Sequence, residues 1–327
     1  MDRSSTFEGL PNELLIDIFE YLPIQDLYKT FFGLNLRLTK IIESLQEFHF
    51  EQLELEKIDD SAFAHRITTL VIRHSNNIDL NRYPKLRALK LQWPTKQQCN
   101  QTINQSQLEH LYIGHSLYEG DTQQLLKHIF INGFPQLHSC YLENFIGNRS
   151  IIRSYSTILP TLVSLKIFTK YSEDIVSLLF LCPNLNQLSI KYFDNAKIDS
   201  NIFREWSLMP HKNLHTLIFD SVDQMSIETI DSILAFVPNV TYLSIISPRC
   251  NTNKIHIERI AYTLHRHLPS LHQFYTSIWL DDLPLSDNYS VNIEAIEWLH
   301  PLFKQIKLSS GGQRLIISSS SYRSKLV

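Results

Sequence analysis

The sequence predicts an α/β fold in which a small helical domain precedes a curved solenoid of parallel strands. A short apolar phrase recurs along most of the chain, helical patterns separate its later copies, and the stretch before the first copy has helical patterns alone. The predicted organisation is a helical domain at 6–48, a solenoid at 49–310 and a tail at 311–327.

The first predicted helix lies in LPNELLIDIFEYL, residues 10–22. Pro11 stands where a helix can begin without losing a hydrogen bond, and Pro23 ends the helix. At 100° per residue, one broad arc holds the apolar side chains of Leu14, Leu15, Ile18, Phe19, Tyr21 and Leu22. The core beneath one short helix needs only part of this arc. We therefore expect something else to cover the rest.

Two further helices complete the predicted helical domain. Asp26 is expected to cap the second helix, which runs through Leu27, Phe31 and Phe32. The third is expected to contain Leu38, Ile41, Ile42 and Leu45. A body of about 40 residues is too small to be stable alone, so it should pack against the first repeat or a partner.

The recurring phrase is apolar, two variable residues, apolar, one variable residue, apolar. Its eleven copies start 17 to 32 residues apart. The alternation at its end indicates a short strand with one buried face. The copies are FEQLEL (50–55), ITTLVI (67–72), LRALKL (86–91), LEHLYI (108–113), LHSCYL (137–142), LVSLKI (162–167), LNQLSI (185–190), LHTLIF (214–219), VTYLSI (240–245), LHQFYT (271–276) and FKQIKL (303–308).

Helical patterns that end at a proline separate the later copies, at 172–182, 226–237, 254–268 and 292–301. One such unit cannot bury its own apolar face, but stacked units share a core. We therefore expect parallel strands on a concave side and helices on a convex side. The first two or three units are too short for a full helix.

Two stretches depart from this plan. The amide-rich segment QQCNQTINQSQ at 97–107 is expected to be an exposed loop. Near the end, RLII at 314–317 has the composition of one strand, and the Ser-rich residues after it are expected to fray.

The N-terminal pattern resembles the F-box, a motif of short helices. The match lies in Leu10-Pro11, Glu13-Leu14-Leu15, Ile18-Phe19, Tyr21-Leu22 and Asp26-Leu27. The phrases that follow resemble leucine-rich repeats, which run for about 20–29 residues each. An F-box followed by such repeats is a common architecture, and the two resemblances together cover nearly the whole chain.

This resemblance implies that the helical domain binds the adaptor of an SCF ubiquitin ligase, which joins the F-box to a cullin. The surplus apolar arc would then be shared between the domain's core and the adaptor. Carried onto this sequence, the adaptor-binding residues are Leu10, Pro11, Glu13, Leu14, Leu15, Ile18, Phe19, Leu22, Asp26 and Leu27. The alternative is that the helices only cap the first edge of the solenoid, as terminal repeats require.

Two departures from the family patterns stand out. Many F-boxes carry a Val-Cys pair and a Trp after the Asp-Leu. This chain has FFGLNLRL at 31–38 instead. The difference affects the expected affinity for the adaptor. The repeats lack the usual Asn three residues after the strand, so we expect irregular repeats and uneven curvature.

Composition narrows the classes of partner. Thirty basic and thirty-three acidic residues give a net charge of −3. The sequence has no basic stripe of the kind that binds phosphate, which argues against nucleic acid as the main partner. The longest apolar run, 178–182, is far short of the roughly 20 residues that span a bilayer, and no signal segment begins the chain. Cys99, Cys140, Cys182 and Cys250 lie far apart, which favours free thiols and an intracellular place, cytoplasmic or nuclear.

Sequence patterns of catalysis and metal binding are missing. His211 and His215 are four residues apart, but His215 lies in a strand phrase, so the pair is not one helical face. No Gly-rich phosphate loop or Gly-x-Ser-x-Gly turn occurs, and the Asp59-Asp60 pair fits a solvated turn. We therefore expect no enzyme activity, cofactor or metal.

The remaining candidate is the outward row of the strand phrases. Lys90, Tyr112, Tyr141, Lys166, Ser189, Ile218, Ser244 and Tyr275 are expected to line the concave face. Tyrosine offers a large contact area with few rotors, which suits a target protein, although strand propensity alone also favours tyrosine there. The leading hypothesis is a non-catalytic substrate receptor of an SCF-type ligase. The alternative is an interaction scaffold without ubiquitin transfer.

Overall fold

The computed structural model describes the chain in thirteen segments. These are residues 7–22, 24–45, 48–52, 64–73, 78–114, 119–143, 157–169, 172–192, 210–221, 227–250, 257–280, 307–311 and 314–318. The predicted helix at 292–301 and the Ser-rich residues from 319 onward lie outside these segments.

Residues 7–45, called the helical domain below, form three short α-helices after a 3-10 turn. The elements are η1 (Phe7–Gly9), α1 (Asn12–Glu20), α2 (Ile24–Thr30) and α3 (Leu36–Ser44). α1 begins directly after Pro11, as expected. α2 begins at Ile24, so Asp26 stands in its first turn and does not cap it, contrary to the prediction. An acidic side chain in a first turn still complements the positive end of the helix dipole.

The repeats form one sheet of 12 strands, called the repeat sheet, which stacks in chain order as far as β10. Every neighbouring pair from β1 to β10 is parallel. The predicted solenoid is therefore confirmed over these strands. They are β1 (Phe48–Gln52), β2 (Ile67–Ile72), β3 (Ala88–Leu91), β4 (His110–Ile113), β5 (Ser139–Leu142), β6 (Ser164–Thr169), β7 (Gln187–Tyr192), β8 (Thr216–Ser221), β9 (Tyr242–Cys250) and β10 (Gln273–Leu280).

The last two strands break the parallel rule. β12 (Arg314–Ser318) pairs antiparallel with β10, and β11 (Lys307–Gly311) pairs antiparallel with β12. The strand expected at 314–317 is present, but the copy at 303–308 does not lie beside β10 in parallel. The reason is the connection between β11 and β12, because a link of two residues joins antiparallel strands and cannot make a crossover.

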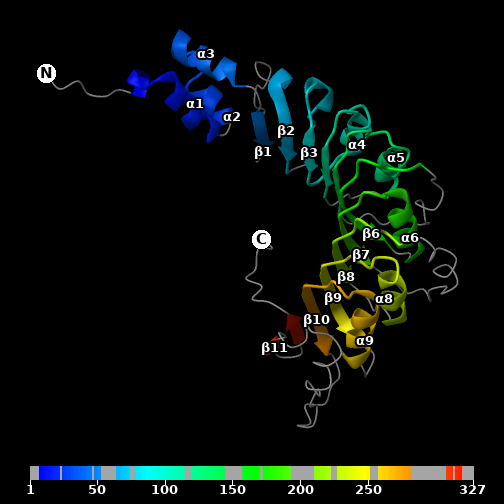
Figure 1. Cartoon of the computed structure of the whole chain (residues 1–327). Helices are drawn as coiled ribbons and strands as arrows, with labels where there is room; N and C mark the ends of the chain where they lie inside the picture. Colours follow the sequence, from blue (N-terminus) through cyan, green and yellow to red (C-terminus); the bar gives the residue numbers. More distant parts are fainter. Residues whose placement is uncertain are drawn as a thin grey trace.

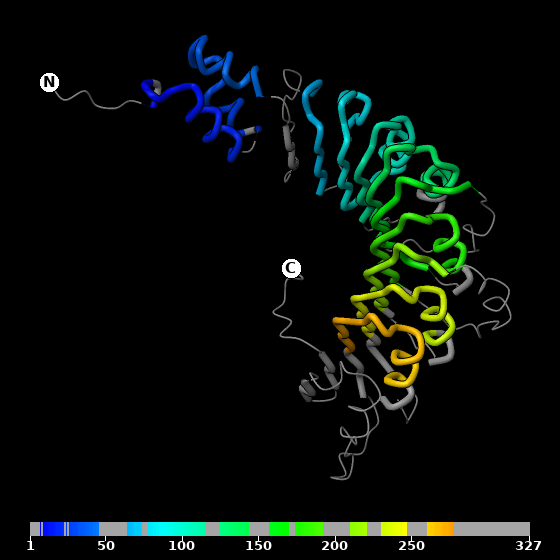
Figure 2. The backbone as a smooth tube through the Cα atoms, in the orientation of Figure 1, coloured from blue at the N-terminus to red at the C-terminus, as the bar shows by residue number. Residues whose placement is uncertain are grey.

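Helices cover one side of the repeat sheet. Figure 1 shows the strands along the inner side of an arc and the labelled helices of the repeats along its outer side, and the backbone in Figure 2 follows the same arc. Within their described residues, the two early connections contain 3-10 turns and no α-helix, as their shortness predicts; the turns are η2 (Ala64–Arg66) and η3 (Leu80–Arg82). The described α-helices of the repeats are α4 (Lys96–Thr102), α5 (Glu119–Phe130), α6 (Ser172–Leu181), α8 (Ile227–Leu234) and α9 (Ile257–His267).

The segment at 97–107 is not an exposed loop, which corrects the prediction. It contains most of α4, whose start is fixed by a capping box between Thr95 and Gln98. Gln105 is 5% exposed and donates from its Nε2 atom to the Leu80 carbonyl at 3.1 Å. The Leu80 N–H in turn donates to Oε1 of Gln101 at 3.0 Å. Amide side chains can therefore be buried here because they satisfy the backbone of the preceding turn.

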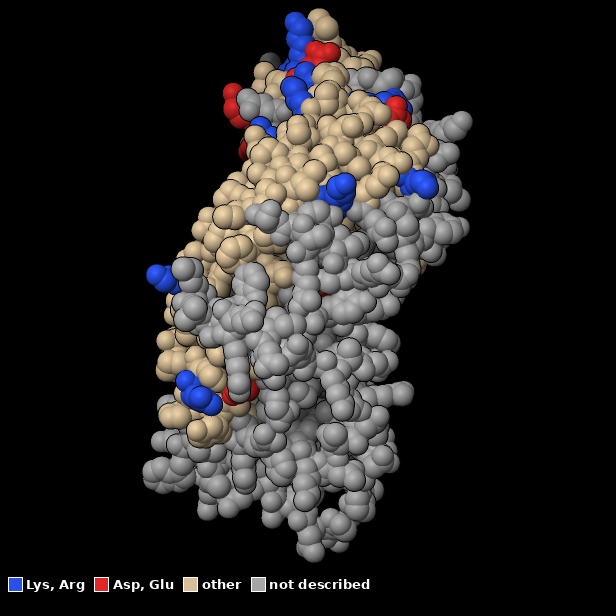
Figure 3. Space-filling model, turned by 90° about the vertical axis from the view of Figure 1, so that its right-hand side faces the viewer, with Lys and Arg blue, Asp and Glu red and all other residues tan. Residues whose placement is uncertain are grey.

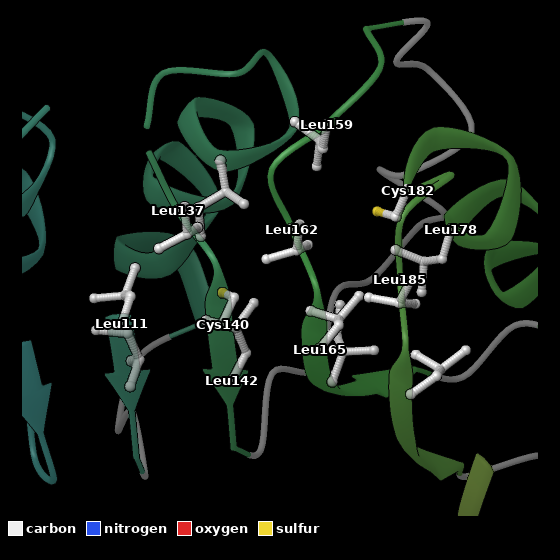
Figure 4. Close-up of a cluster of buried hydrophobic side chains, with 14 of the residues drawn as sticks. Leu111, Leu137, Cys140, Leu142, Leu159, Leu162, Leu165, Leu178, Cys182 and Leu185 are labelled. Atoms are coloured by element: carbon white, nitrogen blue, oxygen red, sulfur yellow. The ribbon is translucent and has the colours of Figure 1, made fainter. Parts of the chain in front are cut away.

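The core runs along the sheet as a ladder of register partners, one from each strand from β2 to β10. Each member of this ladder is at most 2% exposed: Leu70, Leu89, Leu111, Cys140, Leu165, Leu188, Leu217, Leu243 and Phe274. Figure 4 shows part of this layer between the strands and the helices. The buried side chains of the helical domain belong to the same cluster. The helical domain therefore packs on the first repeats, as its small size predicts.

A ladder of side-chain amides joins successive repeats at the start of the strands. Asn184 donates from Nδ2 to the Pro160 carbonyl at 2.8 Å, and Asn213 donates to Pro183 at 2.9 Å. Asn239 continues the series with a 2.8 Å bond to the Lys212 carbonyl, and Gln107 makes the equivalent 2.9 Å bond to Pro84. Each donor stands directly before the first apolar residue of its phrase. The amide that the sequence lacks after the strand is thus present before it.

Candidate protein-binding sites

Four side chains on the concave face form one continuous stack. Lys90, Tyr112, Tyr141 and Lys166 come from β3 to β6 and are register partners in that order. The two tyrosine rings stack with centroids 4.5 Å apart and planes 13° apart. The ammonium of Lys90 lies 4.8 Å from the Tyr112 centroid, and that of Lys166 lies 4.3 Å from the Tyr141 centroid. We call these four residues the Lys–Tyr stack.

The stack is possible because every member occupies the same register position of adjacent parallel strands. Side chains at such positions repeat at the strand spacing of about 4.8 Å, which suits ring stacking and cation–π contact. The outward row predicted from the sequence is therefore present, and within it the structure brings these four side chains into direct contact.

Glu143, directly after β5, completes this site and was not predicted. The Tyr112 hydroxyl donates to Oε2 of Glu143 at 2.8 Å. Burial is the main cause that raises the pKa of Tyr112, and the bond to the carboxylate raises it further. Tyr112 therefore remains a neutral donor at every physiological pH. Glu143 stands two residues after Tyr141, and strand alternation alone could have placed it on the same face.

Two of the other members of the predicted row are less available than the stack. Ser189 and Ser244 are 5% and 3% exposed, so they offer little surface to a partner. Tyr275 lies on β10, four strands beyond Lys166, and is half-buried. The described concave site thus centres on the Lys–Tyr stack and leaves out Ser189 and Ser244, whereas Ile218 and Tyr275 are half-buried like the tyrosines of the stack.

The second candidate site is the outer face of α1. Leu14 and Ile18 are 48% and 38% exposed, and Tyr21, at the end of the helix, is 90% exposed. Their spacing of four and three residues places them along one stripe of the helix. Tyr21 was not among the predicted binding residues, although the helical spacing could have included it. A stripe of this kind is what an amphipathic helix presents to a groove on a partner.

The residues carried over from the F-box resemblance divide into an outer and an inner group. Leu15, Phe19 and Leu27 are at most 1% exposed, so they cannot touch a partner while the domain is folded. These three side chains lie in the core that the helical domain shares with the repeats. The residues with accessible surface are Leu10, Pro11, Glu13, Leu14, Ile18, Leu22 and Asp26.

One arginine fixes the start of α1 against α3. Arg37 donates from its Nε atom to Oδ1 of Asn12 at 2.8 Å, and its Nη2 atom bonds the Leu10 carbonyl. Beneath α1, the Phe19 and Phe31 rings lie 5.1 Å apart, and Phe7 lies 5.3 Å from Phe31. The position of the exposed stripe of α1 is therefore fixed by the Arg37 hydrogen bonds and by the aromatic packing beneath the helix.

Cysteine and histidine side chains, which can bind metal ions or act as nucleophiles, occur among the described residues. Within them, no group of three His, Cys, Asp or Glu side chains could hold a metal ion. The thiols of Cys140 and Cys182 are buried and free, and burial raises the pKa of Cys182 to about 12, so neither is a ready nucleophile. His211 Nε2 bonds the Cys182 carbonyl at 2.9 Å and belongs to the packing between repeats.

Charge on the outer side of the arc is dispersed. Figure 3 shows the Lys and Arg side chains of the described residues scattered over a mostly uncharged surface, with acidic side chains among them near the top. None of the described helices is long and apolar enough to cross a membrane.

Comparison with known proteins gives structural neighbours alone. No protein-family model matches the chain, and no curated protein matches it. An internalin from Listeria monocytogenes is similar at 13% identity over 85% of this chain and 75% of that chain, with a TM-score of 0.41. The leucine-rich repeat-containing protein LegL7 from Legionella pneumophila is similar at 10% identity over 84% of this chain and 92% of that chain, with a TM-score of 0.37. TM-scores this low do not establish a shared fold, so the fold is assigned from the strand order and register of the repeat sheet.

Proposed function

We propose that this chain is a non-catalytic substrate receptor of an SCF-type ubiquitin ligase. In this proposal α1 binds the adaptor, and through it a cullin, while the concave face of the repeat sheet binds a target protein. The observation that carries the proposal is the apolar stripe of Leu14, Ile18 and Tyr21, which stays exposed after the helical domain has packed on the repeats. The F-box resemblance of the same residues names the adaptor as the protein that covers the stripe.

The stripe has the physical character of a docking face. Large apolar side chains gain roughly 25 cal/mol for each Å² removed from water, so two or three of them can anchor a complex. Leu15 and Phe19 fill the core from one edge of the apolar arc of α1, and the exposed side chains lie along its other edge. Their exposure is a cost to the free protein that a partner would remove.

The two surfaces would act by proximity. The helical domain lies at one end of the arc in Figure 1, and the strands of the Lys–Tyr stack follow it along the inner side. A target held there would present its lysines to a ubiquitin-charged enzyme at high effective concentration. The bond-forming residues would belong to other chains of the complex.

The test is co-purification of the full chain with the SCF adaptor. The double variant Leu14→Gln/Ile18→Gln should lose at least about tenfold in affinity, because two apolar anchors become polar. A matched control is Ile131→Gln/Ile158→Gln, since these residues are 46% and 50% exposed and lie in the repeats. The control should bind like the native chain, and circular dichroism should show both variants folded.

A different result would favour a second function. If the native chain does not bind the adaptor, or if both double variants bind equally well, α1 is not the docking face. The helical domain would then be a cap on a scaffold that binds proteins without ubiquitin transfer. The shared core of the helical domain and the first repeats, which includes Leu15 and Ile67, is the observation that favours this alternative.

A further inference from the structure

The Lys–Tyr stack leaves a defined set of groups free for a ligand. Each tyrosine ring has a neighbouring ring on one side and an ammonium on the other, so no ring face remains open. What the rings present to solvent is their edges, which carry partial positive charge. The stack therefore offers a ligand no ring face to stack on, and its exposed edges and ammonium groups suit negative groups.

Both lysines keep hydrogen-bonding capacity for a ligand. An ammonium above a ring face still has N–H donors that point away from the ring. Among the described residues, neither Lys90 nor Lys166 has a carboxylate partner, and the Tyr141 hydroxyl has no hydrogen-bond partner. The concave face thus carries two ammonium groups and one hydroxyl in fixed positions.

The spacing of the two ammonium groups selects the shape of the ligand. The successive separations along the stack place the two nitrogens at most about 14 Å apart, in keeping with three strand spacings. An extended peptide advances about 3.3 Å per residue, so side chains four residues apart span about 13 Å. Positions i and i+4 of an extended segment also project to the same side, because side chains alternate with period two.

We infer that the Lys–Tyr stack binds an extended acidic segment of a partner protein, with carboxylates at positions i and i+4 on Lys90 and Lys166. The segment would run across β3 to β6 on the concave face. This inference relies on the proposed function only for calling the partner a ubiquitination target. Binding of the acidic segment itself does not depend on the helical domain.

Glu143 provides a second test of the inference, because its substitution should change binding in the opposite direction to loss of the lysines. It is the acidic side chain bonded to the stack, and its charge opposes an incoming carboxylate. The Glu143→Gln substitution removes this charge, and its amide oxygen can still accept the bond from Tyr112. A purely structural stack gives no reason for this change to strengthen acidic-peptide binding.

The experiment is a selection of random twelve-residue peptides displayed on phage against the immobilised full chain. The expected result is enrichment of peptides with two acidic residues four apart. Synthetic peptides from the enriched pool should bind about tenfold more weakly to Lys90→Met/Lys166→Met, because two exposed ion pairs are lost. Binding should also weaken as salt increases.

The matched control is Lys127→Met/Lys212→Met, which makes the same change in net charge on α5 and in the turn before β8. This control should bind the peptides like the native chain, and Glu143→Gln should bind them more tightly. Peptides without an acidic pair, no enrichment at all, or equal losses in both lysine variants would each overturn the inference. Adaptor binding by the same preparations reports separately on α1, so failure of one proposal leaves the other distinguishable.

Discussion

The helical domain and the repeat sheet distribute their apolar side chains differently. In the repeat sheet, the ladder that includes Leu188 is almost completely buried on the helix side, and the concave row holds mostly polar and aromatic residues. In the helical domain, α1 buries Leu15 and Phe19 but leaves Leu14 and Ile18 exposed. The sheet thus buries its own ladder of apolar side chains, whereas the helical domain leaves some of its apolar side chains exposed. This difference underlies the two proposals: the helical domain would meet its partner through apolar contact, and the sheet would meet its partner through charge and ring edges.

The largest expected difference between the two regions comes from one leucine in each. Leu188→Ala should lower the free energy of unfolding by about 3 kcal/mol, because Leu188 is fully buried between its neighbours on β6 and β8. Leu14→Ala should change it by less than about 0.5 kcal/mol, because the side chain is half exposed. Urea denaturation measures both. Equal losses would show that the stripe on α1 supports the fold and is not surplus.

Two glycines provide a second contrast between the regions. A Cβ on Gly114, just after β4, would clash with the Gln92 carbonyl oxygen, so Gly114→Ala should cost about 2 kcal/mol through displaced backbone. Gly33 lies between α2 and α3 with φ +80° and open space around it, so Gly33→Ala should cost about 1 kcal/mol through backbone strain alone.

Asparagine separates these two mechanisms. Asn adopts the left-handed conformation more readily than Ala, so Gly33→Asn should be milder than Gly33→Ala. Gly114→Asn should be at least as harmful as Gly114→Ala, because the clash with Gln92 remains. Thermal unfolding of the four variants provides the comparison. The same order at both sites would contradict the mechanisms assigned to them.

Acid should weaken the repeats through His211. Burial lowers the pKa of His211 below its ordinary value of 6.5, and its Nδ1 atom has no hydrogen-bond partner to stabilise a proton. The unfolded chain therefore takes up the proton first as the pH falls. The contribution of His211 to stability is complete above about pH 6.5 and declines below it, by at most about 1.4 kcal/mol per pH unit.

The variant His211→Gln isolates this contribution. Glutamine can keep the bond to the Cys182 carbonyl but does not titrate. The difference in unfolding free energy between the native chain and the variant, measured from pH 8 to pH 5, should shrink as the pH falls. The helical domain has no histidine between residues 7 and 45, so it lacks a histidine source of this effect. A pH-independent difference would show that His211 titrates alike in both states.

The sequence predicted the architecture well where a pattern repeats. The phrase located β2 to β10, and the helical arc located α1, because burial imposes a period that side chains must follow. It failed at 97–107, where buried amides such as Gln105 bond backbone of the preceding turn, 25 residues earlier in the sequence. Such long-range hydrogen bonds leave no periodic trace in a polar segment.

The candidate site was predicted in part for a similar reason. Strand alternation placed Lys90, Tyr112, Tyr141 and Lys166 in one row, but their mutual contact and the bond from Tyr112 to Glu143 depend on register and rotamers. On α1, the arc identified the apolar residues without dividing them into buried and exposed. That division depends on where α3 packs, which Arg37 helps to fix.

The smallest expected difference between the two regions comes from an asparagine of the amide ladder and the asparagine that caps α3. Asn213→Ala should cost about 1 kcal/mol, because it removes one hydrogen bond to an adjacent repeat at an exposed position. In the helical domain, Asn35→Ala should cost a similar amount, since Asn35 caps α3 by accepting the Leu38 N–H at 2.8 Å. The two substitutions should cost similar free energies of unfolding, but they should differ in how far that cost depends on a neighbouring substitution.

Double variants test that coupling. Asn213 also donates to the Asn184 side chain at 3.4 Å, so the losses from Asn184→Ala and Asn213→Ala should not add. Asn184 and Asn35 share no partner and lie in different regions, so their losses should add within about 0.3 kcal/mol. Urea denaturation of the single and double variants gives both interaction energies. Strict additivity in the ladder would mean that each amide acts on its own repeat boundary, and the repeats would then be joined by independent bonds rather than by a connected chain of them.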